Sequence, residues 1–182
     1  MKLHKDVEEI LLSYEEIKAK CEDLGKKISK DYEGKTPIFI GLLKGAVPFL
    51  AELIKHIECP MEIDFIDVAS YSGTQSTGKV TFLKDVSCDL EGRNVVFVED
   101  IIDTGLTLSE VVKVFKERNI ASYEIVTLVD KPEGRKISGV SPKYIGFNIP
   151  NKFVVGFGLD YNELYRNLPY IGVLKRSVYE KE

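Results

Sequence analysis

The chain has 182 residues, of which 44% are hydrophobic, and a formal net charge of −4 at pH 7. A chain of this size can bury a full hydrophobic core, whereas a broad nucleic-acid surface would require a basic composition. We find neither an apolar run of about 18 residues nor a signal peptide pattern, so we expect a cytoplasmic protein without membrane contact. The three cysteines are far apart, which argues against a disulfide framework or a zinc site.

Strands and helices alternate along the predicted elements. Apolar residues recur at steps of three and four over residues 7–28, which predicts one amphipathic helix there. A buried strand is predicted at 37–43, and a turn at Lys44-Gly45 leads into a helix over 46–57. Further strands are predicted at 61–68, 80–83, 95–98, 123–129, 144–149, 153–157 and 171–174, and a further helix begins near 108. This order predicts an α/β fold with a central parallel sheet flanked by helices.

The segment from Asn94 to Thr107 carries the strongest functional pattern. A buried strand ends at Glu99 and Asp100, and Asp103 follows before the next helix starts. Open α/β sheets bind their ligands at this place, beyond the carboxyl ends of the strands. Acids near a helix start are often simple caps, but capping would explain only one of these three.

The turn at 103–107 has the composition of an anion site. Backbone N–H groups at a helix start have no helical acceptor, and Gly105 permits a close approach of the backbone. The hydroxyls of Thr104 and Thr107 add donors. The neighbouring carboxylates would repel a phosphate unless a divalent cation or a cationic part of the substrate lies between them. The pattern therefore indicates a phosphorylated, polyhydroxylated ligand bound with Mg²⁺. No Walker A pattern is present.

Three other stretches are candidates for the same site. The Lys44-Gly45 turn follows a predicted strand and would form a second anion site, although a lone Lys-Gly is usually an ordinary loop. Ser70-Tyr71 begins a polar, glycine-bearing segment that by itself resembles a surface loop. Residues 152–166 combine a short strand, a glycine turn and a polar loop. Asp160 and Arg166 in that loop would by default form a solvated ion pair.

The sequence Val-Glu-Asp-Ile-Ile-Asp-Thr-Gly at 98–105 closely resembles the phosphoribosyl-pyrophosphate signature of type I phosphoribosyltransferases, in the form of the hypoxanthine-guanine branch. The resemblance extends in order from Ile38 to Arg166. It implies one domain over 1–182, with a core of roughly 35–135 and a hood from 1–30 and 136–182. It implies purine salvage, in which hypoxanthine or guanine reacts with phosphoribosyl pyrophosphate in a Mg²⁺-dependent homodimer or homotetramer.

The resemblance also implies roles for the residues that bind the phosphoribosyl group. Glu99 and Asp100 would hold the ribose hydroxyls and Mg²⁺, and Asp103 would act on the proton at purine N7 as general acid or base. The pyrophosphate would bind the amides of Lys44 and Gly45 beside a cis peptide bond between Leu43 and Lys44. The phosphate cradle would consist of Asp103, Thr104, Gly105, Leu106 and Thr107, where Leu106 replaces a lysine of some relatives.

The resemblance also implies which residues would contact the purine base and the second Mg²⁺. Lys131 would donate to the 6-oxo group, Phe153 would stack on the purine, and the Val154 backbone would bond the ring edge. Asp160 would bind a second Mg²⁺ carrying pyrophosphate, which Arg166 would contact. The segment that begins at Ser70 and Tyr71 would close over the reacting centre.

Two alternatives remain open from the sequence. A xanthine-preferring or broader 6-oxopurine enzyme would use the same site residues. A regulator with the phosphoribosyltransferase fold could bind RNA instead of catalysing a reaction. That second alternative requires a basic face, and the acidic balance of the chain argues against it.

Overall fold

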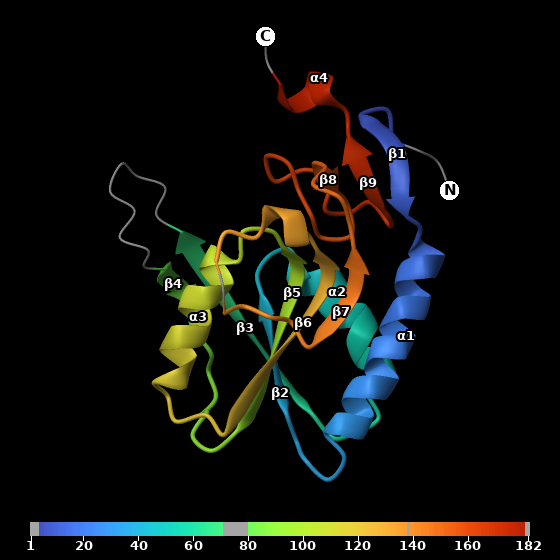
Figure 1. The fold of residues 1–182 in the computed structure, drawn as a ribbon. Helices are drawn as coiled ribbons and strands as arrows, with labels where there is room; N and C mark the ends of the chain where they lie inside the picture. The colour runs from blue at the N-terminus through green and yellow to red at the C-terminus, as the bar shows by residue number, and fades with distance from the viewer. Residues whose placement is uncertain (1–3, 71–79, 138, 181–182) are drawn as a thin grey trace.

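The computed structural model describes residues 4–70, 80–137 and 139–180. Within these ranges a larger sheet has the strand order β4-β3-β2-β5-β6-β7, and a smaller sheet has the order β1-β9-β8 (Figure 1). The strands are β1 (Val7–Leu12), β2 (Ile38–Leu42), β3 (Glu62–Ser70), β4 (Val80–Lys84), β5 (Asn94–Ile102), β6 (Ser122–Asp130), β7 (Tyr144–Asn148), β8 (Val154–Val155) and β9 (Ile171–Leu174). The helices are α1 (Tyr14–Asp31), α2 (Ala46–Leu53), α3 (Leu106–Lys116) and α4 (Arg176–Tyr179), with 3₁₀ turns η1 (Ile54–His56) and η2 (Pro132–Gly134).

The larger sheet is parallel except at one edge. β3, β2, β5, β6 and β7 pair in parallel, and β4 joins β3 as an antiparallel edge strand. All five residues of β2 are buried, as are Val95 to Val98 of β5. Such continuous apolar runs are typical of parallel strands that are covered on both faces. The predicted α/β fold with a central, mostly parallel sheet is confirmed.

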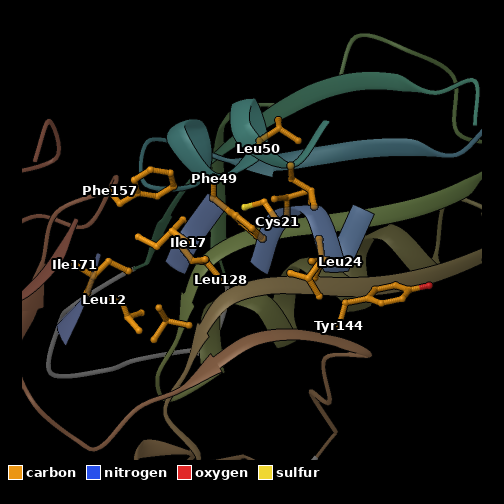
Figure 2. Packing of buried hydrophobic residues seen from close by; sticks show 14 of the residues in the cluster. Leu12, Ile17, Cys21, Leu24, Phe49, Leu50, Leu128, Tyr144, Phe157 and Ile171 are labelled. Carbon is orange, nitrogen blue, oxygen red and sulfur yellow. The ribbon is translucent and has the colours of Figure 1, made fainter. Parts of the chain in front are cut away.

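Different helices cover the two faces of the larger sheet (Figure 1). Because side chains alternate along a strand, Ile38 and Ile40 of β2 pack in the cluster beneath α3, whereas Phe39 packs in the cluster beneath α1 and α2. Figure 2 shows the cluster beneath α1 and α2, to which Ile17 of α1 and Phe49 of α2 both belong. The central strands are therefore rigidly held, and their carboxyl ends form a fixed edge for a site.

The predicted helix over residues 7–28 is wrong at its start. Val7–Leu12 form strand β1, which pairs antiparallel with β9, and α1 begins only at Tyr14. Ser13 separates the two elements because it forms a capping box with Glu16: the Glu16 N–H donates to the Ser13 hydroxyl, and the Ser13 N–H donates to the Glu16 carboxylate at 2.8 Å. A short strand can match the helical repeat by coincidence, so periodicity alone did not distinguish them.

The smaller sheet lies beyond the carboxyl ends of β5 and β6 (Figure 1). The predicted strand at 153–157 is shorter in the structure, because Gly156, Phe157 and Gly158 have φ values of 98°, 49° and 102° that end the extended conformation. Two elements from the stretches assigned to the hood, α1 and β7, pack against or within the larger sheet. The boundary between core and hood stays a prediction. In the described ranges, no helix has the length and apolar character needed to cross a bilayer.

Candidate functional site

The turn between β5 and α3 forms a small pocket at the carboxyl edge of the larger sheet. Gly105 precedes α3 with φ 78°, a left-handed conformation that favours glycine. A pocket of about 140 Å³ is lined there by Glu99 and by residues 101–108. The predicted cradle residues Asp103, Thr104, Gly105, Leu106 and Thr107 are therefore gathered around one concave space at a helix start, where free N–H groups and the helix dipole favour an anion.

A second cleft of about 230 Å³ adjoins this turn and collects residues from distant parts of the sequence. Its members come from β5, from the end of β6, and from the segment around β8. Most of them are predicted site residues, and Ile101 and Leu159 add apolar surface. The lining consists of Asp100, Ile101, Asp103, Lys131, Phe153, Val154, Leu159 and Asp160.

The predicted pyrophosphate turn after β2 lies beside Asp100. The peptide bond between Leu43 and Lys44 is cis, as predicted. A Cβ atom at Gly45 would overlap the Asp100 carboxylate, so only glycine fits there without movement. The turn after β2 and the acid at the end of β5 are thus in direct contact across neighbouring parallel strands.

The loop after β8 brings a third group of charges to this edge. Arg166 Nη1 lies 2.9 Å from Asp160 Oδ1 and donates to the Gly158 carbonyl at 2.8 Å. Glu163 contacts two cations: its Oε2 accepts from Lys44 Nζ at 2.8 Å, and its Oε1 lies 3.4 Å from Arg166 Nη2. Glu163 has φ 64°, and its N–H donates to Asp160 Oδ2 at 2.9 Å. The loop therefore places an internal anion between the side chain of Arg166 and the ammonium of Lys44, the residue whose backbone amide is predicted to bind pyrophosphate.

Comparison with known proteins identifies the family. The family described as the phosphoribosyl transferase domain matches residues 9–162. The chain belongs to the phosphoribosyltransferase family. It is 54% identical over 180 residues to the hypoxanthine-guanine phosphoribosyltransferase of Streptococcus thermophilus, covering 98% of this chain and 99% of that protein. It is 55% identical over 180 residues to the protein of the same name from Lactococcus lactis, covering 98% and 97%.

Solved structures of phosphoribosyltransferases have the same fold. A hypoxanthine phosphoribosyltransferase from Staphylococcus aureus superposes with a TM-score of 0.94 at 49% identity, covering 98% of this chain and 97% of that one. The hypoxanthine phosphoribosyltransferase of Trypanosoma cruzi, solved in complex with its product IMP, gives a TM-score of 0.93 at 39% identity, covering 98% and 100%. The predicted family resemblance is confirmed.

The acids of the phosphoribosyltransferase signature lie in an environment that disfavours two adjacent negative charges. Burial and the neighbouring Asp100 raise the pKa of Glu99 well above its ordinary value. Burial raises the pKa of Asp100 to about 6; Asp160 adds to the rise, while the Ile101 N–H at 2.8 Å opposes it. A cation at this edge would relieve the repulsion between the carboxylates.

Lys131 and Asp103 also line this cleft and face each other. The Lys131 side chain is only 7% exposed, and its Nζ lies 3.8 Å from Asp103 Oδ2. Burial lowers the pKa of Lys131, and attraction to Asp103 only partly offsets this effect. The Asp103 side chain is 49% exposed, so it remains accessible to a ligand. This buried ammonium in the lining of the cleft offers hydrogen-bond donors only.

The structure adds residues that the sequence analysis did not single out. Glu163 could have been noticed as a further acid between Asp160 and Arg166, but its contact with Lys44 depends on the tertiary fold. Tyr179 of α4, which stacks on the ring of Phe153, was missed as well, because the contact joins segments 26 residues apart. Of the predicted closing segment, Ser70 is the last residue of β3, and Tyr71 lies outside the described residues.

Proposed function

We propose that this protein transfers the phosphoribosyl group of phosphoribosyl pyrophosphate to N9 of hypoxanthine or guanine and releases pyrophosphate, with Mg²⁺ as cofactor. One observation carries the proposal: a single cleft is lined by a buried ammonium, an aromatic ring and three carboxylates, and it adjoins an anion cradle. The ammonium and the ring suit a purine base. The carboxylates and the cradle suit phosphoribosyl pyrophosphate, which carries a metal-bound pyrophosphate and a single phosphate. The relatives named above support the same activity.

The purine would bind between Lys131 and Phe153. The Lys131 ammonium has donors and no acceptor, so it favours the 6-oxo group of hypoxanthine and guanine over the amino group of adenine. Phe153 is 39% exposed and lines the cleft, which leaves ring surface for the base. Val154 would bond the ring edge through its backbone. Asp103 lies within reach of Lys131 and would hold or move the proton at purine N7.

The phosphates would bind at the two anion sites on the sheet edge. The cradle at 103–107 would take the single phosphate through backbone N–H groups and the Thr104 and Thr107 hydroxyls. The pyrophosphate would bind the amides of Lys44 and Gly45 and the guanidinium of Arg166. These groups would stabilise the charge that develops on the leaving pyrophosphate.

The donor set fits Mg²⁺. Carboxylate oxygens are ligands that Mg²⁺ prefers, and because burial raises the pKa of Asp100 to about 6, a bound cation would favour its ionised form. Among the described residues no group of three or more His, Cys, Asp or Glu side chains forms a ready cage. Asp100, Asp160 and Glu99 would therefore hold the ion together with substrate oxygens and water. When bound, Mg²⁺ would neutralise the pyrophosphate and favour its departure.

Two of these acids would also act on the sugar. Glu99 and Asp100 lie near the carboxyl end of β5, beside the cradle, and would accept hydrogen bonds from the ribose hydroxyls. Their negative charge would also stabilise the positive ring of an oxocarbenium-like transition state, because carboxylates close to a developing positive charge lower its energy.

Product formation from phosphoribosyl pyrophosphate tests the proposal directly. Hypoxanthine, guanine, xanthine and adenine are supplied in turn, with Mg²⁺ and with a chelator. We expect rapid nucleotide formation from hypoxanthine or guanine, little from adenine, and none without the metal. Highest rates with xanthine would indicate the xanthine-preferring alternative, and no product together with RNA retention on filters at low salt would indicate the regulator. The predicted homodimer or homotetramer is tested by light scattering; the cytoplasmic location stays a prediction.

A further inference from the structure

The aromatic ring of Phe153 is supported by a tyrosine of the short helix α4. The ring centroids of Phe153 and Tyr179 lie 4.8 Å apart with planes inclined by 20°, which is a stacked arrangement. Tyr161 meets the Phe153 ring edge-on, at 5.7 Å and 85°. Phe153 lines the cleft, whereas Tyr179 is not among the described residues that line it. Tyr179 therefore contacts the Phe153 ring from outside the cleft.

The backbones that carry the two rings are joined by the smaller sheet. The Leu174 N–H donates to the Phe153 carbonyl at 2.9 Å, and Leu174 is the last residue of β9. The next residue, Lys175, donates its N–H to the Asp6 carbonyl at 2.9 Å, which fixes the direction in which α4 leaves the sheet. The strand that holds the Phe153 backbone thus also presents Tyr179 to the Phe153 side chain.

We propose that Tyr179 is a positioning residue for the purine. The terminal torsion of a phenylalanine ring is broad, so an unsupported ring at the cleft would have to lose rotational freedom when a base binds. The stack with Tyr179 and the edge contact with Tyr161 fix the ring plane before the base arrives. The inference rests on the proposed function, in which Phe153 stacks on the purine.

The test is the change in KM for each substrate when Tyr179 is replaced. Tyr179→Ala should raise KM for hypoxanthine and guanine about 2- to 12-fold, the range that corresponds to the loss of one aromatic pair. KM for phosphoribosyl pyrophosphate should stay within about twofold, because the cradle and the Lys44-Gly45 turn belong to other elements. Tyr179→Phe keeps the ring and should restore the unmodified KM, whereas Tyr179→Leu keeps apolar volume without a ring and should not.

Val178→Ala is the matched control. Val178 precedes Tyr179 in α4 and packs on the cluster of Val7, Val155, Tyr170 and Leu174, so its truncation loosens the helix without removing the ring. Thermal unfolding of every variant reports whether stability has changed. An unchanged purine KM in Tyr179→Ala, restoration by Tyr179→Leu, or an equal rise in Val178→Ala would each overturn the inference.

Failure of this inference can be distinguished from failure of the proposed function. If Phe153→Ala raises the purine KM and Tyr179→Ala does not, the role of Tyr179 is wrong and the proposed function stands. If Phe153→Ala also leaves the purine KM unchanged, the stacking role of Phe153 and the inference are both wrong. If the unmodified protein converts no 6-oxopurine, the proposed function is wrong, and the role of Tyr179 is wrong with it.

Discussion

Replacement of Lys131 by methionine separates recognition from structural support, because the two roles predict different effects on stability. Folding buries the ammonium and lowers its pKa below the ordinary value of 10.5. A lysine with a lowered folded-state pKa makes the folded protein less stable at neutral pH; this penalty decreases once the pH rises past the folded-state pKa and is gone above the unfolded-state value of 10.5. Methionine has a similar length and no charge. The free energy of unfolding of Lys131→Met at neutral pH should therefore be unchanged or increased.

Activity should respond in the opposite direction. A hydrogen bond from the ammonium to the 6-oxo group is a charged one, and such bonds contribute about 1.5–3 kcal/mol. Its loss should lower kcat/KM for hypoxanthine and guanine roughly 10- to 150-fold. KM for phosphoribosyl pyrophosphate should change by less than about twofold, because that substrate binds at other residues. Initial rates with each substrate varied in turn measure the effect on activity, and urea unfolding measures the effect on stability.

The control for Lys131→Met is Lys26→Met, which removes one positive charge from an exposed position on α1. It should change neither the purine kinetics nor the binding of phosphoribosyl pyrophosphate. If kcat/KM for the purines in Lys131→Met stays within about twofold of the unmodified protein, the recognition role is refuted. A fall in stability by more than about 1 kcal/mol, with both substrates affected equally, would identify Lys131 as a structural residue.

Three further substitutions test other parts of the site and the fold. Asp103→Asn should lower kcat roughly 10²–10⁴-fold with a smaller effect on phosphoribosyl pyrophosphate binding; normal turnover with weak binding would make Asp103 a structural helix cap. Glu163→Gln should lower KM for phosphoribosyl pyrophosphate about two- to fivefold, because Lys44 and Arg166 lose an internal competitor, whereas a rise would mean that Glu163 orients them. Burial opposes ionisation of Asp64, but hydrogen bonds from two N–H groups, a hydroxyl and an ammonium outweigh it and hold its pKa well below the ordinary 3.8. Asp64→Asn should lower the free energy of unfolding near neutral pH by about 1.5–3 kcal/mol. That difference should shrink as the pH falls below 3.8, since a carboxylate with a lowered pKa contributes its stability above the unfolded-state value and loses it toward the folded-state value. An equal difference in urea unfolding at both pH values would contradict this assignment.

The larger sheet could be predicted from the sequence because its strands are local features. β2 and β5 are apolar runs that stay buried on both faces, so length and composition are sufficient to find them. The cradle could be predicted for the same reason: acids end a strand, and a Thr-Gly turn precedes a helical repeat, all within fourteen neighbouring residues from Asn94 to Thr107.

The parts that could not be predicted depend on partners far away in the sequence. β1 matches a helical repeat, and only its pairing with β9 makes it a strand. The contact between Glu163 and Lys44 requires left-handed residues in the loop after β8, and local sequence does not specify such conformations outside glycine. The stack of Tyr179 on Phe153 likewise exists only because β8 and β9 are paired.

The pairing of β1 with β9 also sets an order of assembly during synthesis. The larger sheet is complete in sequence once β7 has been made, whereas β1 has no partner until Ile171–Leu174 emerge from the ribosome. β1 therefore stays unpaired for nearly the whole of translation, and contacts of this sequence separation are slow to form. The purine end of the cleft includes Val154 of β8, which is held by the same late strand. In a nascent chain the phosphate cradle would therefore form first, and the residues proposed to contact the purine would reach their final positions last.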